Sequence, residues 1–105
     1  MAPAQILSTY ATAWAITQRM LEAARSESWD TLIDLNPSRD ALFAELMQAP
    51  PTDSQPAAET AMLIRNILAA DAQIQSLSRA WMDEINGVLT SVQVERKLLK
   101  AYESV

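Results

Sequence analysis

The feature that most constrains the fold of this chain is an apolar repeat in its C-terminal half, between Ile64 and Tyr102. Its members alternate at steps of three and four residues, which is the spacing of one face of an α-helix. They are Ile64, Ile67, Asp71, Ile74, Ser78, Trp81, Ile85, Val88, Val92, Leu99 and Tyr102. A helix that begins near residue 57 and carries this face would be roughly 65 to 70 Å long without a break. The repeat therefore predicts the main helix of the domain.

One position in this long segment carries a signal that ends helices. The pair Asn86-Gly87 contains the only glycine of the chain, and glycine is common directly after the last helical residue. A break there gives helices over about 57–85 and 88–103, of which the second folds back as a fourth helix. The alternative is a tail that projects into solvent. We favour the break, because two preceding helices of about 30 Å each cannot cover the whole long segment.

Two shorter amphipathic segments precede the long one. The first is expected over about 4–25, with apolar residues at helical spacing. The second is expected over 29–48, but Pro37 interrupts it, and both a kink and a restart of the helix at this proline fit the spacing. A Pro-rich connection, 49–56, follows without apolar periodicity.

Composition supports an all-α fold with one core. The chain has 105 residues, of which 50% are hydrophobic and only one is glycine. Ala, Leu, Glu, Gln and Met are abundant, and these residues lose little rotamer freedom in a helix. We therefore expect a single domain over residues 1–105, a small antiparallel bundle of three to four helices with a long third helix.

The residue types that most enzymes use are absent. Without His or Cys, the usual general base, the usual metal ligands and a thiolate nucleophile are missing. A single glycine also excludes a glycine-rich phosphate loop. We expect a protein that is not an enzyme, with no catalytic residue, no cofactor and no metal site.

Charge and hydropathy exclude two further partner classes. The formal net charge is -5, and no cluster of Lys or Arg precedes Arg96, so nucleic acid is not an expected partner. The N-terminal segment has no basic residue before Arg19, and polar residues interrupt its apolar positions. We therefore expect neither a secretory signal nor a membrane span, and we expect a cytoplasmic protein.

Several apolar side chains fall where one or two neighbouring helices would not bury them. Met62, Leu68 and Leu98 lie outside the main stripe on a helical wheel, and Met47, Met62 and Met82 have flexible side chains that can repack. Exposed apolar helix surface suits the recognition of an amphipathic helix from another protein. A fourth helix of the chain itself or a dimer interface would cover it equally well.

Asp71 is a polar residue on the apolar stripe of the long segment. A buried carboxylate needs a partner, because leaving it unpaired is costly. Asp71 would anchor the backbone of a bound partner or fix the register of the helices. The alternatives are that it lies solvated at the edge of the stripe or pairs with an arginine on a neighbouring helix.

Segments of this sequence, taken in order, resemble the flagellar export chaperone family FliT. The resemblance extends from about Ile16 to Tyr102. It is carried by MLEAARSESWDTL at the end of the first helix, RDALFAEL, the Pro-containing loop, ILAADAQIQSLSRAWMDEI and the closing Lys100-Ala101-Tyr102. One departure from the family pattern is Pro37, inside the second helix.

The resemblance implies a cytoplasmic type III flagellar export chaperone. Such a protein binds the C-terminal helical region of the filament-cap protein FliD, prevents premature assembly, and delivers FliD to the export ATPase complex and export gate. In some bacteria, family members also inhibit the flagellar master transcriptional regulator. A tyrosine that Tyr102 matches is implicated in docking to the export machinery, and apolar residues of the second and third helices contact clients.

From the residues and the resemblance together we expect a site that binds protein partners and involves no nucleic acid or membrane. Its predicted residues are Leu68, Met62, Asp71, Met82, Leu98 and Tyr102. The alternative function is a homodimeric helical adaptor, or a regulator that inhibits a flagellar transcription factor by protein contact.

Overall fold

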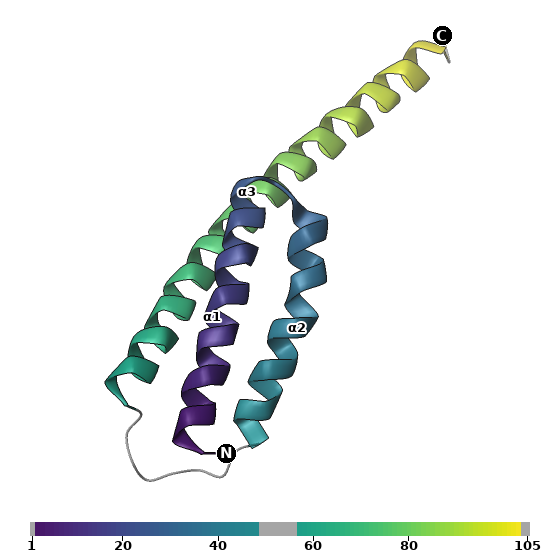
Figure 1. Ribbon diagram of the computed structural model, residues 1–105. Helices are drawn as coiled ribbons and strands as arrows, with labels where there is room; N and C mark the ends of the chain where they lie inside the picture. The colour runs from purple at the N-terminus through teal and green to yellow at the C-terminus, as the bar shows by residue number, and fades with distance from the viewer. Residues whose placement is uncertain (1, 49–56, 104–105) are drawn as a thin grey trace. The chain divides into compact units, whose positions relative to one another are not determined.

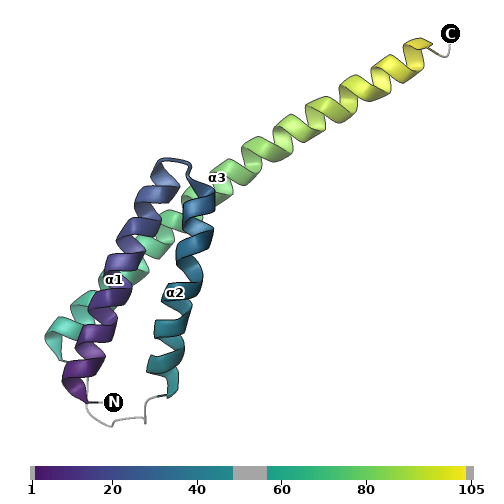
Figure 2. The same cartoon turned by 45° about the vertical axis from the view of Figure 1, so that its right-hand side comes forward.

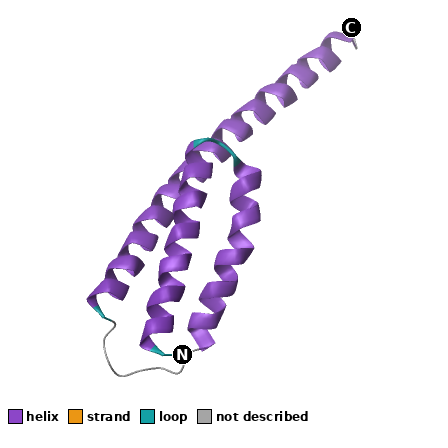
Figure 3. Cartoon of the chain, in the orientation of Figure 1, coloured by secondary structure: helices purple, strands orange, loops and turns teal. Residues whose placement is uncertain are grey.

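The computed structural model describes residues 2–48 and 57–103, and they form three helices (Figures 1 and 3). These are α1 (Pro3–Arg25), α2 (Trp29–Gln48) and α3 (Ala58–Glu103). No strand occurs in these two ranges. The predicted all-α class, with a long third helix, is confirmed. The expected Pro-rich connection, 49–56, lies outside the described residues.

Contacts between residues divide the chain into two compact units, Met1–Gln75 and Ser76–Val105. The first contains α1, α2 and residues 58–75 of α3, and we call it the three-helix unit. The second contains the remainder of α3, and we call it the C-terminal unit. The core described below belongs to the three-helix unit, because every buried residue of the described ranges lies there.

Helix α1 supplies most of the core of the three-helix unit. Its neighbour α2 runs beside it in both views of the ribbon (Figures 1 and 2). Six residues of α1 are buried, whereas no residue of α2 is. The buried side chains are Ala13, Thr17, Met20, Leu21, Ala23 and Ala24 from α1, and Thr60, Ile67, Ala70 and Ile74 from α3. Small side chains on α1 let neighbouring backbones approach closely, so this helix is the centre of the unit.

The turn after α1 sends the chain back along the same helix. The N–H of Ser28 donates to the carbonyl of Ala23 at 2.8 Å, and the N–H of Glu27 donates to that of Ala24 at 3.2 Å. This pair of bonds is the Schellman arrangement, which satisfies carbonyls at a helix end. It requires a left-handed residue, and Glu27 takes that conformation with φ of 58°. A tight turn of this kind fixes α2 antiparallel to α1.

Pro37 lies inside α2 without dividing it, so the restart considered from the sequence does not occur. Proline has no N–H to donate to the carbonyl four residues earlier, which here belongs to Ile33. The Ile33 side chain is 63% exposed. Because this face of α2 is in contact with solvent, water can satisfy the carbonyl that the helix leaves without a donor.

The expected break at Asn86-Gly87 is wrong, because α3 continues through both residues. Gly87 does not have a positive φ, so it does not form the left-handed cap that ends a helix. Thr90 instead donates its hydroxyl to the carbonyl of Asn86 at 2.8 Å, within the helix. A glycine inside a helix costs only about 1 kcal/mol relative to alanine, so one glycine without the left-handed conformation does not by itself end a helix of this length.

Replacing Met20 by alanine should destabilise the three-helix unit by about 2 to 5 kcal/mol, since the side chain is 2% exposed and its removal leaves a cavity in the core. Urea unfolding followed by circular dichroism measures the change. Met47→Ala is the matched control, because Met47 is 86% exposed and its loss should change the free energy of unfolding by less than about 0.5 kcal/mol. Equal effects of the two substitutions would contradict this core.

Gly87→Ala should strengthen α3, because an added Cβ meets no atom within 4 Å. The gain of about 1 kcal/mol should slow amide hydrogen exchange around residue 87 about fivefold. Ser91→Ala is the control, with a smaller gain expected from its smaller difference in helix propensity. Faster exchange in Gly87→Ala would show instead that the helix ends at this glycine.

Candidate functional site

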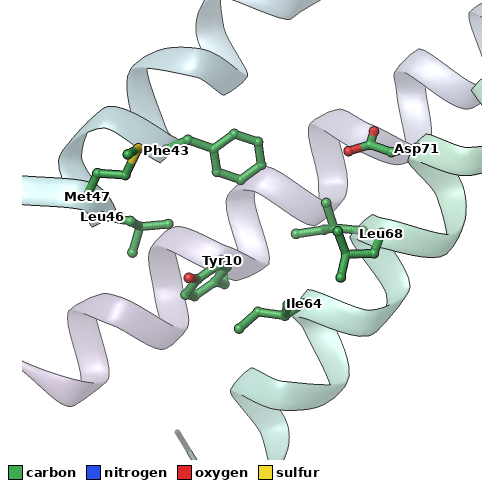
Figure 4. A pocket seen from close by; sticks show the side chains of 8 residues that line it. Tyr10, Phe43, Leu46, Met47, Ile64, Leu68 and Asp71 are labelled. Atoms are coloured by element: carbon green, nitrogen blue, oxygen red, sulfur yellow. The ribbon is translucent and has the colours of Figure 1, made fainter. Parts of the chain in front are cut away.

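A groove in the three-helix unit is lined by side chains from all three of its helices (Figure 4). Its volume is about 400 Å³. The lining residues are Tyr10 from α1, Phe43, Leu46 and Met47 from α2, and Ile64, Ile67, Leu68 and Asp71 from α3. Apart from the Tyr10 hydroxyl and the Asp71 carboxylate, the lining side chains are apolar. This composition is typical of a site that binds an apolar surface.

The spacing of the lining residues follows from helix geometry. On α3, residues 64, 67, 68 and 71 differ by three, four and seven positions, so they lie on one face over two turns. On α2, residues 43, 46 and 47 do the same over one turn. Figure 4 shows Tyr10 between the two rows. The row on α3 extends roughly 10 Å at 1.5 Å per residue, which matches two turns of a partner helix.

The apolar walls of this groove are partly in contact with solvent. Leu68 is 63% exposed and Met47 is 86% exposed, whereas Ile67, one position before Leu68, is buried. Ile67 packs into the core while Leu68 lies at the open side. Covering exposed apolar surface of this kind is favourable, at about 25 cal/mol for each Å² removed from water. The groove can therefore bind a second apolar surface without breaking its own core.

A polar network lies at the Asp71 end of the groove. Arg39 of α2 forms an ion pair with Asp71 of α3 and donates from the same nitrogen, Nη1, to the hydroxyl of Thr17 on α1 at 3.2 Å. Thr17 in turn donates to the carbonyl of Ala13 at 2.8 Å, which satisfies its buried hydroxyl. The Arg39 guanidinium also lies 5.4 Å from the centre of the Phe43 ring. One arginine thus contacts side chains from all three helices.

Charge is divided unequally between the two units. Residues 1–75 contain four Arg and nine Asp or Glu, a net charge of -5. Residues 76–105 contain four Arg or Lys and four Asp or Glu, a net charge of zero. The unit that carries the groove therefore carries the whole net charge of the chain. Its negative potential favours the approach of partners that bear positive charge.

A family model described as flagellar protein FliT matches residues 7–104. The chain belongs to the FliT family. No curated protein and no solved structure gives a match. The family model covers the whole of α3 as well as the groove, so both units of the chain contribute to the matched region.

The structure brings together two of the six residues predicted for the FliT-like binding site. Leu68 and Asp71 both line the groove. For Asp71, the structure shows the alternative in which it pairs with an arginine of a neighbouring helix, and it does so at the edge of the groove. Met62 is exposed on α3 but is not among the lining residues.

The other three predicted residues belong to the C-terminal unit. Met82 and Leu98 are exposed there. Tyr102 lies within the range of α3, but its side chain is outside the described part of the structure. In the described ranges, no group of three or more His, Cys, Asp or Glu could hold a metal ion. None of the described helical segments is both long and apolar enough to span a membrane.

Sequence reasoning missed most of the groove lining. Tyr10, Phe43, Leu46, Ile64 and Ile67 lie on apolar helical faces, and such faces indicate a core. Burial confirms this for Ile67 alone, since the other four are only half-buried. The number of these residues could have indicated a groove, because the three apolar faces contain more large side chains than one small bundle core requires.

Proposed function

We propose that this member of the FliT family is a cytoplasmic type III flagellar export chaperone. It binds the C-terminal helical region of the filament-cap protein FliD, prevents premature assembly and delivers FliD to the export ATPase complex and export gate. The observation that carries the proposal is the open apolar groove, together with a family match over residues 7–104. A chaperone of this kind needs a reversible binding surface and no chemistry of its own.

The client in this proposal is an amphipathic helix that lies in the groove. Two turns of its apolar face contact the α3 row that includes Ile64 and Leu68, and the α2 row that includes Phe43 and Met47. The flexible Met47 side chain adapts to the shape of the client. Covering the apolar face of the client hides the surface through which it would assemble, and the open side of the groove allows its release.

The C-terminal unit has a separate role in this proposal, which is to dock the loaded chaperone on the export machinery. Its exposed apolar side chains include Met82 and Leu98, and three basic residues lie near its end, at Arg96, Lys97 and Lys100. Exposed apolar surface beside positive charge suits contact with another protein. We assign Tyr102 to the same docking contact, as the resemblance implies.

A second candidate function is a homodimeric adaptor, or a regulator that inhibits the flagellar master transcriptional regulator by protein contact. It is supported by the apolar side chains exposed on the C-terminal unit, which self-association would cover. They are Met82, Val88, Leu89, Val92, Val94, Leu98 and Leu99. Light scattering of the full chain, alone and mixed with FliD, separates the candidates. A dimer that persists on dilution and does not bind FliD would favour the second candidate function.

Leu68→Asp should weaken binding of the FliD C-terminal region by at least about tenfold, because the client would have to desolvate a carboxylate at the centre of the α3 row. Isothermal titration of the full chain measures the affinity. Ile33→Asp is the matched control: Ile33 has the same 63% exposure but does not line the groove. Its affinity should equal that of the wild type. Unchanged affinity in Leu68→Asp would remove the groove from the client site.

Tyr102→Ala should leave the affinity for the FliD C-terminal region unchanged, because Tyr102 belongs to the C-terminal unit and the groove belongs to the other. The same substitution should abolish co-purification with the export ATPase complex. Pull-downs with the ATPase complex and titration with FliD, carried out on one preparation, provide both readouts. Loss of FliD binding instead would place Tyr102 in the client site.

A further inference from the structure

Arg39 does not line the groove, yet it contacts two residues that do. It pairs with Asp71 on one wall, and its guanidinium lies over the ring of Phe43 on the other. Its third contact, with Thr17, reaches the buried face of α1. Arg39 therefore connects the two walls of the groove to each other and to the core.

The apolar packing of α2 constrains the spacing of the two walls only loosely. No residue of α2 is buried, so α2 lies on the unit with half-buried apolar contacts that do not fix its position sharply. Hydrogen bonds and ion pairs are directional, and they restrict geometry more than apolar contact does. A short polar contact from α2 to both α1 and α3 therefore limits how far the walls of the groove can separate.

We propose that Arg39 is a positioning residue that sets the separation of α2 and α3 at one end of the groove, and with it the affinity for a client helix. The predicted effect on affinity for a client helix rests on the proposed function, whereas the effect on the separation of the helices does not. The ion pair sets the width of the groove at Asp71, and the cation over the Phe43 ring keeps this ring on the wall. The client helix contacts the walls and not Arg39.

The contribution of Arg39 to positioning is separable from a contribution to stability. The side chains of Arg39 and Asp71 are 12% and 28% exposed, so Asp71 turns to water when its partner is removed. Removing one partner of an ion pair that is this largely buried also lowers the free energy of unfolding, which the added Asp71→Asn substitution described below offsets. Methionine at position 39 keeps an apolar stem against Phe43 and removes the charge and the donors. Arg39→Met should therefore fold and lose the fixed spacing.

The first experiment measures the spacing directly. The chain has no Cys, so Ala44→Cys on α2 and Ala69→Cys on α3, both at exposed positions, give a unique pair of spin labels. Pulsed electron paramagnetic resonance then reports the distribution of distances between the helices. Arg39→Met should broaden it, and Arg39→Lys, which keeps the charge, should restore most of the wild-type distribution. An unchanged distribution in Arg39→Met would overturn the proposal.

The second experiment measures affinity for the FliD C-terminal region in the full chain. Arg39→Met should bind about tenfold more weakly, and Arg39→Lys should stay within about threefold of the wild type, with thermal unfolding used to show that both variants are folded at the temperature of the titration. Arg25→Met is the matched control. Arg25 also connects two helices, by a hydrogen bond of 3.0 Å to Gln73, but neither residue lines the groove. Its affinity should not change.

The outcomes separate this proposal from the proposed function. Wild-type chain that does not bind FliD contradicts the proposed function, while the label distances still test Arg39. Wild-type chain that binds, with equal affinity in Arg39→Met, overturns the role of Arg39 and leaves the chaperone function standing. If Arg39→Met does not fold, Arg39→Met combined with Asp71→Asn removes the unpaired carboxylate, and the same broadening is expected in this variant.

Discussion

The burial of one face of α1 is the interaction on which the rest of the structure depends. Alanine and threonine at its centre let α2 and the first part of α3 approach the same helix, and six of its residues are buried as a result. A helix that serves as the core for two neighbours leaves the outer apolar side chains of those neighbours without a partner. The groove is a direct consequence, because its walls are the parts of α2 and α3 that α1 does not cover (Figure 4).

Polar contacts restrict the relative positions of the three helices, which the apolar core alone leaves undetermined. Thr17 is a polar residue in the middle of the buried face of α1, and its hydroxyl both donates to Ala13 and accepts from Arg39. Apolar contact alone is non-directional and permits helices to slide past one another. The chain of contacts from Ala13 through Thr17 and Arg39 to Asp71 fixes one relative position of three helices. Within this chain of contacts the Nη1 atom of Arg39 reaches both Thr17 and Asp71, whereas Arg39 Nε is buried without a hydrogen-bond partner.

Periodicity was sufficient to predict the helical class of the fold and the long third helix, because a repeat of three and four residues has one regular interpretation. It failed at Gly87, because a glycine ends a helix only where it takes the left-handed conformation, and Gly87 does not. It also failed for most of the groove. A helical wheel shows which residues share a face and not which helix covers that face, so it does not distinguish the half-buried Tyr10 and Phe43 of the groove from core residues. Leu68 and Asp71 were found because each departs from the stripe, one in position and one in polarity.

The absence of any buried residue among those of α2 also bears on dynamics. The free energy needed to open a segment locally depends on the apolar area that the segment alone keeps from water. By that measure α2 opens at lower cost than α1, so the α2 wall can move at the end of the groove away from Arg39 while the α3 wall stays with the core. A compliant wall adjusts to helices that differ in side-chain volume, and it lowers the barrier for a bound helix to leave.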